Sequence, residues 1–518
     1  MTHSSEQRQY RPVKPLAPEI LGQVTLYLEQ RLYQQGFSLL FSTLTAGTGY
    51  PSVAAHIPSL QHLVFASTLI VHPSVTTRTN AADRHAGAND ALKYLRHVNE
   101  LVGPRSSGLV TALRFANAGG FRASRRARLP PNDVAGEDDD ELSKINSPLM
   151  EDSIWAKAED FWSVVGWAFN CSVAHSERWK RWEVWLGLMV DILEADLAIA
   201  AETNDGENCL LSAYLSPFVN QGRSNKRRLM RALLADGSPK SLAEFGEVWK
   251  NETKLAKKKD EKAEMLQMRK RKKLDLDKEE YADYLDSDSE NDGISTSKSQ
   301  SRRPSLPLED GDIEEEEDEP EGDQKDNSLT RLSSSIPLRQ RFLALLSQYT
   351  TQHPALFLPP DELYDLYTEF TRPLPLPIFQ LLILPAKRFL PPTSQISLTQ
   401  TLLCALLATP GPPCQPQHLT QEIWQAKYAL ATATNSGAGD NAKLSLLIED
   451  LLSALSKAGA LKPGPEVLGF VTEGVLARET KAGFDARRKT GDKAKDEVEA
   501  TKILKLSGVR MKTLVQML

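Results

Sequence analysis

Six of the eight tryptophans in the chain lie in one stretch, Trp155–Leu197. Apolar residues at helical spacing predict two helices there, over about Trp155–Phe169 and Glu177–Ala198, joined by a turn at Cys171–Ser176. Each tryptophan can bury about 200 Å² of surface, so this hairpin (residues 155–198) is expected to nucleate a helical core. Binding of a partner protein is the alternative role of this aromatic cluster. The cluster comprises Trp155, Trp162, Trp167, Trp179, Trp182 and Trp185.

The rest of the chain also favours helices. Apolar residues recur at helical spacing from Pro18 onward, over Asn89–Leu101, and again from Pro337 onward, whereas strand-forming runs are scarce. The sequence therefore predicts an all-α fold with two irregular helical domains, whose helices could pair as in HEAT-like arrays.

Composition divides the chain into four parts. Hydrophobic residues make up 41% of the sequence, below the 45–50% or so that is usual for a folded chain, so a sizeable unfolded portion is expected. We predict a flexible N-terminus over 1–16 and an N-terminal helical domain over 17–249, with a mobile loop at 118–148. A disordered charged linker is predicted over 250–335, and a C-terminal helical domain over 336–518.

Local signals in the C-terminal part set further expectations. Asp361 follows two prolines and is expected to cap a helix. Pro373, Pro375 and Pro377 predict an extended connector before a short helix over 378–384. The last helix is expected over Asp492–Leu518, with a highly charged first half and an end apolar enough to dock or bind.

The charges of the linker are segregated along the sequence. Its first part is basic, and residues 309–326 then hold twelve acids against one lysine. High local charge with few aromatic residues is typical of disorder. We expect trypsin to cut this segment readily and to leave two resistant fragments.

Basic clusters within and before the linker predict a nuclear import signal or contacts with phosphate. A solvated, charged helix is the alternative interpretation. The residues concerned are Lys226, Arg227, Arg228, Lys257, Lys258, Lys259, Arg269, Lys270, Arg271, Lys272 and Lys273.

Three serines of the linker are candidate phosphorylation sites. Ser287 and Ser289 each precede an acid by three residues, as an acid-directed kinase requires, and Ser305 follows a basic pair. Each phosphate would add about two negative charges and would strengthen the contrast with the basic cluster.

Motifs of catalysis and metal binding are missing from the sequence. It contains no phosphate-binding P-loop, no G-x-S-x-G nucleophile elbow and no H-E-x-x-H zinc motif, and its four cysteines fit no zinc pattern. No secretory signal opens the chain, and no run of about 18 apolar residues predicts a membrane span. We expect no catalytic, cofactor-binding or metal-binding residues, no cofactor and no small-molecule substrate.

These observations favour a non-enzymatic scaffold or adaptor subunit in the nucleus, assembled with other protein subunits. It would serve chromosome maintenance, transcription or ribosome assembly. The alternative is a sequence-nonspecific nucleic-acid binder that uses Lys254–Lys273 and Arg122–Arg128. A related alternative is a histone-chaperone-like protein that uses the acidic tract Glu309–Asp326, and a weaker one is an enzyme without a short sequence signature.

Overall fold

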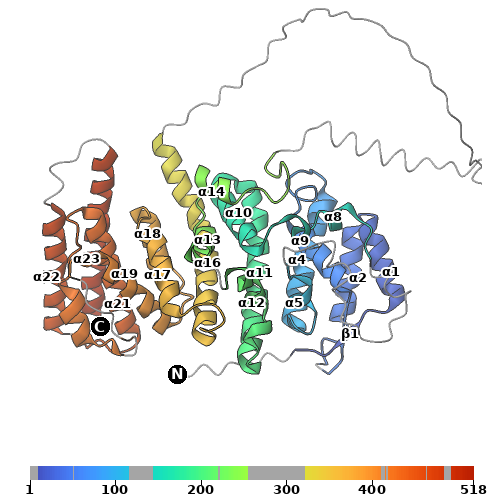
Figure 1. Ribbon diagram of the computed structural model, residues 1–518, viewed down its shortest axis with the longest axis horizontal. Coiled ribbons are helices and arrows are strands. Elements are labelled where there is room, and N and C mark those ends of the chain that lie inside the picture. The colour runs from blue at the N-terminus through green and yellow to red at the C-terminus, as the bar shows by residue number, and fades with distance from the viewer. Residues whose placement is uncertain are drawn as a thin grey trace, which may run out of the picture. The chain divides into compact units, whose positions relative to one another are not determined.

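A computed structural model describes residues 10–50, 52–115, 144–219, 222–254, 321–409, 415, 418–462, 464–483 and 492–517. For residues 321–330 and 492–494 it describes the helix but not the side chains. The all-α prediction is confirmed, because helices fill these residues on both sides of the charged segment (Figure 1). Most of the predicted linker, residues 255–320, lies outside the described residues, and so does most of the predicted loop, residues 116–143.

The first helices lie close to their predicted positions, although α4 begins earlier than Asn89. Strands β1 and β2 form a short parallel pair, which is not predicted from the sequence. It orders part of the N-terminal segment that was expected to be flexible. The elements are β1 (Val13–Pro15), α1 (Pro18–Glu29), α2 (Tyr33–Thr45), β2 (Ala55–Ile57), α3 (Leu60–Val71), α4 (Ala82–Leu101) and α5 (Leu109–Ala112).

The tryptophan-rich hairpin differs from the prediction at its start and at its turn. The helix expected over Trp155–Phe169 is split into α9 (Ile154–Lys157) and α10 (Phe161–Ala174). Asp160 causes the break, because its carboxylate accepts a hydrogen bond from the Ser163 backbone N–H at 2.7 Å and caps α10. The turn is shorter than expected, since only His175 separates α10 from α11 (Ser176–Thr203).

Short helices surround the hairpin. Most of them are only one or two turns long, so their stability comes from the core that they cover rather than from their own length. They are α8 (Pro148–Glu151), α12 (Leu210–Leu215), α13 (Arg223–Leu233), α14 (Pro239–Glu244) and the 3₁₀ turns η1 (Gly206–Asn208) and η2 (Ser216–Phe218).

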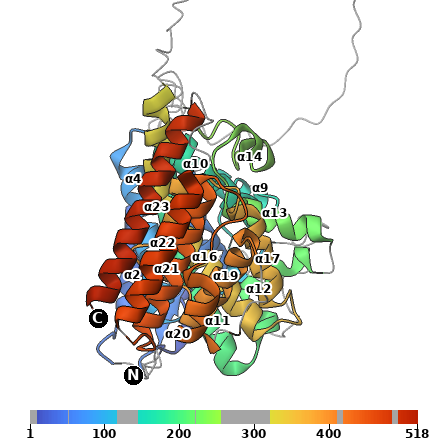
Figure 2. The same cartoon turned by 90° about the vertical axis from the view of Figure 1, so that its left-hand side faces the viewer.

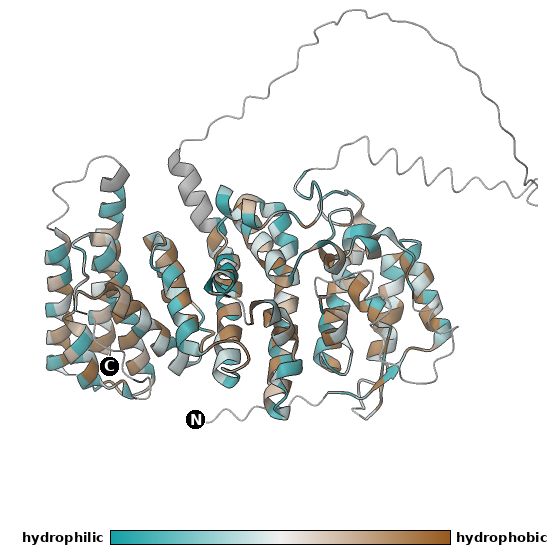
Figure 3. Cartoon of the chain, in the orientation of Figure 1, coloured by the Kyte–Doolittle hydropathy of each residue, from teal (hydrophilic) through white to brown (hydrophobic). Residues whose placement is uncertain are grey.

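The C-terminal part consists of longer helices that pack mainly on helices nearby in the sequence, as Figure 1 shows. Figure 3 shows that single helices carry hydrophilic and hydrophobic residues on different sides. The helices are α16 (Glu321–Gln352), α17 (Pro360–Thr371), α18 (Leu376–Ile383), α19 (Pro392–Leu406), α20 (Gln421–Trp424), the π-helical turn η4 (Gln425–Ala429), α21 (Ala438–Lys457), α22 (Pro465–Gly483) and α23 (Asp492–Met517).

Three differences from the sequence-based expectations involve prolines. Helix α16 begins at Glu321 and continues through Pro337, so the last part of the predicted linker, residues 321–335, is helical, and Leu332 and Ile336 before the proline are buried. Pro359 takes the N-cap position of α17, so Asp361 lies in the first turn instead of capping the helix. Pro377 lies within the first two residues of α18, where a proline is tolerated, rather than in an extended connector.

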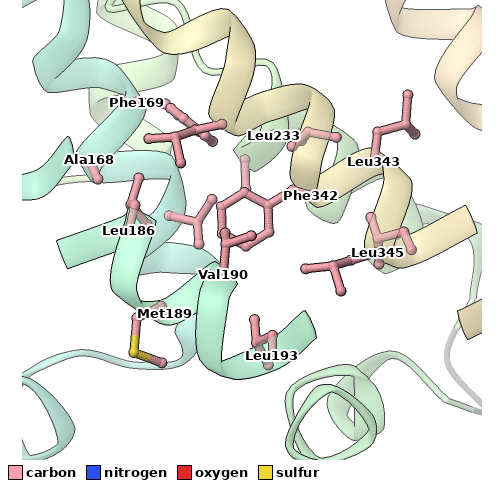
Figure 4. Packing of buried hydrophobic residues seen from close by; sticks show 14 of the residues in the cluster. Ala168, Phe169, Leu186, Met189, Val190, Leu193, Leu233, Phe342, Leu343 and Leu345 are labelled. Atoms are coloured by element: carbon pink, nitrogen blue, oxygen red, sulfur yellow. The ribbon is translucent and has the colours of Figure 1, made fainter. Parts of the chain in front are cut away.

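One continuous hydrophobic core includes residues from both sides of the charged segment. Phe342 of α16 contacts the hairpin, with its ring centroid 6.1 Å from that of Phe161, 6.0 Å from that of Trp162 and 6.2 Å from that of Phe169. Figure 4 shows Phe342 among Leu186, Val190 and other aliphatic side chains. The helical regions before and after the linker are therefore packed against each other, and we call this contact the seam.

Candidate interaction surface

Helix α23 packs beside α21 and α22 at the C-terminal end of the fold (Figure 2). Its inner face is apolar, with Leu504 and Met511 fully buried. Gly508 permits close contact with α22, because a Cβ atom at this position would lie 2.7 Å from a methyl carbon of Val475. The inner face thus fixes the rotation of α23 about its own axis.

Polar contacts on the same side hold the helix in register. The Arg510 guanidinium donates two hydrogen bonds to the Glu449 carboxylate, at 2.6 and 2.8 Å, and this pairing raises the pKa of Arg510. The hydroxyls of Ser507 and Ser445 are 3.0 Å apart and buried. These contacts leave the opposite side of α23 facing solvent.

That opposite side carries four large apolar side chains. Their exposed fractions are 72% for Val498, 47% for Leu506, 59% for Val509 and 81% for Met517. Spacings of eight, eleven and nineteen residues from Val498 place all four on one side of an α-helix. We call this side the outer face of α23. Scattered single apolar residues are normal on a surface, but a shared stripe along a helix indicates a binding site.

Lysines are interspersed with this apolar stripe. Lys502 and Lys505 are exposed and Lys512 is half-buried, and no carboxylate of the described residues lies within ion-pair distance of any of them. The sequence has no Asp or Glu after Glu499. The outer face is therefore both apolar and uniformly positive along most of its length.

A hollow of about 420 Å³ lies beside α22 and is open to solvent. Its walls are mostly apolar and include Leu476 and Ala477, with Glu473 and Lys481 as the charged members. The Lys481 ammonium donates a hydrogen bond to the backbone oxygen of Ala433. The hollow therefore offers an apolar contact area rather than a nucleophile with an adjacent base.

The first predicted basic cluster lies in α13, at the seam, where acids compensate its charge. Lys226 contacts Glu362 at 3.0 Å, and Arg227 forms an ion pair with Glu369 of the same helix, α17. Arg228 turns the other way and pairs with Asp160 at 2.6 Å. These three residues thus connect elements of the fold, and an import receptor or a phosphate would have to compete with their carboxylate partners.

All six tryptophans of the hairpin are buried in the core, none of them more than 5% exposed. The indole N–H of Trp182 donates a hydrogen bond to Glu252 at 2.8 Å, and Arg178 forms a buried ion pair with the same carboxylate. The indole N–H of Trp179 donates to Ser334 of α16 at 2.9 Å. The partner that covers this side of the hairpin is therefore α16 of the same chain.

The other predicted site residues lie outside the described residues. They are the basic residues Lys257, Lys258, Lys259, Arg269, Lys270, Arg271, Lys272 and Lys273, the serines Ser287, Ser289 and Ser305, the arginines of Arg122–Arg128, and the acidic tract up to residue 320.

Comparison with known proteins adds no assignment, because no protein-family model, curated protein or solved structure matches this chain. Among the described residues, no helix is long and apolar enough to cross a membrane. The same residues contain no group of three or more His, Cys, Asp or Glu side chains that could hold a metal ion.

From the sequence, only the end of the last helix is expected to dock, and the rest of the outer face is not predicted. A signal was present in the sequence, because α23 has apolar residues on two opposite sides. Ile503, Leu504 and Met511 form the buried side, whereas Val498 and Val509 belong to the other. A helix that needs a single core contact would show only one such stripe.

Proposed function

We propose that this protein is a non-enzymatic scaffold subunit of a nuclear multiprotein complex, and that it holds a partner protein on the outer face of α23. The complex would serve chromosome maintenance, transcription or ribosome assembly. The observation that carries the proposal is the stripe of four exposed apolar side chains on a helix whose other side is fixed in the fold. Burial of apolar side chains contributes most of the affinity of such interfaces.

The nuclear part of the proposal rests on the sequence. With Lys226–Arg228 paired at the seam, the clusters Lys257–Lys259 and Arg269–Lys273 are the stronger candidates for an import signal. Substitution of Arg269–Lys273 by alanine in a fluorescent fusion should move the protein from the nucleus to the cytoplasm. A fusion that is cytoplasmic without any substitution would contradict this part.

Affinity purification with mass spectrometry tests the scaffold part. The tagged full chain should recover stable protein partners, and Leu506→Asp with Val509→Asp should lose at least one of them. Leu26→Asp is the matched control, because Leu26 is also a leucine exposed to 45%, but it lies on α1. Recovery of the chain without partners, or equal losses with the control, would overturn the proposal.

A further inference from the structure

The outer face of α23 combines two properties that restrict what can bind there. Its apolar stripe runs from Val498 to Met517, about 28 Å at 1.5 Å per residue, which is the length of an ordinary helix of about 20 residues. Lys502 and Lys505 lie within and beside the stripe, and the sequence between Val498 and Met517 has a single acid, Glu499, at the start of the stripe. A ligand must therefore offer apolar side chains and negative charge at the same time.

We propose that the outer face of α23 binds an amphipathic helical segment of a partner protein whose apolar stripe is flanked by Asp and Glu. This inference rests on the proposed function and names the chemistry of the partner. The aliphatic side chains of Val498, Leu506, Val509 and Met517 would pack against the apolar stripe of the segment. Its acids would pair with Lys502, Lys505 and Lys512, which have no carboxylate partner within the described part of the chain.

A second copy of this chain fits the outer face poorly. In a twofold-symmetric contact the same surface meets itself, so the lysines of one copy would lie near those of the other. No acid after Glu499 is present on this helix to compensate them. Like charges placed together at an interface are unfavourable, and they select against self-association.

Nucleic acid and membrane surfaces also fit less well than a protein. Leu506 and Val509 lie between Lys505 and Lys512, so a phosphate backbone that follows the lysines would cover apolar side chains without gaining contacts to them. Helices that lie in a membrane interface bury Trp, Phe and Leu, and α23 contains no aromatic residue. The aliphatic stripe with flanking lysines thus matches an acidic amphipathic helix best.

Fluorescence anisotropy with the full chain and two labelled synthetic peptides of about 20 residues tests the proposal. Both peptides carry the same leucine stripe, flanked by glutamate in one and by lysine in the other. The acidic peptide should bind the unaltered chain, and the double variant Lys502→Glu/Lys505→Glu should bind it at least about tenfold more weakly. The basic peptide should show the opposite preference, because the charge reversal restores complementarity.

Lys240→Glu is the matched control, because Lys240 is exposed in the first turn of α14 and no carboxylate of the described residues lies within ion-pair distance of it. It should leave the binding of both peptides unchanged. Equal binding of the acidic peptide to the unaltered chain and to the double variant would overturn the inference. So would binding of duplex DNA or of vesicles with anionic lipid, if the double variant abolished it while the acidic peptide did not bind.

Affinity purification separates a failure of this inference from a failure of the proposed function. If Leu506→Asp/Val509→Asp loses cellular partners but Lys502→Glu/Lys505→Glu keeps them, the face binds a partner that is not acidic. The proposed function then stands and the partner chemistry is wrong. If neither double variant loses partners, the proposed function itself fails at this face.

Discussion

The ring of Phe342 lies 6.0 Å from the indole of Trp162, although the charged linker separates the two residues in the sequence. Beside this contact, the buried Arg339 guanidinium donates hydrogen bonds to the backbone oxygens of Leu233 and Ala235, at 2.8 and 2.7 Å. Burial lowers the pKa of Arg339 to about 9. The seam thus combines close aromatic packing with buried hydrogen bonds. Both kinds of contact stabilise the association of the helical regions before and after the linker.

We predict that the two halves of the chain stay associated after the linker is cut. A recognition site for a specific protease, placed within residues 280–300 of the full chain, would allow cleavage after folding. The two fragments should then elute together in gel filtration, because the aromatic contacts of Phe342 do not depend on the linker. Phe342→Asp should separate them, since a buried carboxylate without a partner is strongly unfavourable. Separate elution of the unsubstituted fragments would contradict the prediction.

Truncation of a core tryptophan should strongly destabilise the fold. Trp162 and Trp182 are fully buried, so Trp162→Ala or Trp182→Ala should lower the free energy of unfolding by about 3–5 kcal/mol. Phenylalanine at either position should be milder, and urea titration followed by circular dichroism measures the difference. The unaltered protein should show blue-shifted tryptophan emission. A folded Trp182→Ala variant of unchanged stability that has lost a partner would favour the interface role of the cluster.

The buried ion pair between Arg178 and Glu252 predicts an asymmetric response to substitution. Arg178→Met should cost about 3–5 kcal/mol, because it leaves the Glu252 carboxylate buried without its cation. Arg178→Met with Glu252→Gln should be more stable than Arg178→Met alone, since the glutamine is neutral and still accepts the indole hydrogen bond of Trp182. Urea titration of the two variants checks this. A double variant less stable than Arg178→Met alone would contradict the prediction. The Glu252 carboxylate would then stabilise the fold through contacts other than its ion pair with Arg178.

Two glycines of α22 should respond in opposite ways to alanine. A Cβ atom at Gly474 would lie 1.9 Å from the backbone oxygen of Ala429, so Gly474→Ala should destabilise the protein by about 3 kcal/mol. Gly469 has open space around it, and Gly469→Ala should stabilise by up to about 1 kcal/mol through helix propensity. Thermal unfolding of the two variants measures both effects. Equal melting temperatures would show that α22 does not approach η4 so closely.

Acid should destabilise the fold through two buried histidines. Burial lowers the pKa of His62 and of His72 to about 4, from an unfolded value near 6.5. The unfolded state therefore binds more protons between these values, so stability is fully present above pH 6.5 and falls as the pH drops towards 4. The loss is up to about 3 kcal/mol per histidine. The stability advantage of the unaltered protein over His62→Gln should shrink across this range in urea titrations, and a constant difference would contradict the assignment.

Local patterns in the sequence predict the long helices of both parts of the chain. The apolar spacing around Trp182 and the left-handed Gly459 after α21, with φ of +66°, are local signals, and the structure has the corresponding helices. Local signals also placed the last helix close to its observed bounds. The capping of α10 by Asp160 is equally local, but the predicted helix runs across Asp160 because the apolar pattern continues there.

Which helix faces pack together depends on the three-dimensional fold. In the sequence, Lys226 and Arg227 form a basic cluster with no acid nearby. In the fold, α17 packs beside them, so that Lys226 pairs with Glu362 and Arg227 with Glu369. Similarly, the fold buries Met511 of α23 and leaves Val509 in solvent, although both are apolar. A helix is held by hydrogen bonds between residues four apart, so its periodicity can be recognised in a short stretch of sequence. Packing between helices that are distant in the sequence depends on the sum of many weak contacts across the whole core. It therefore cannot be predicted from any short stretch of sequence.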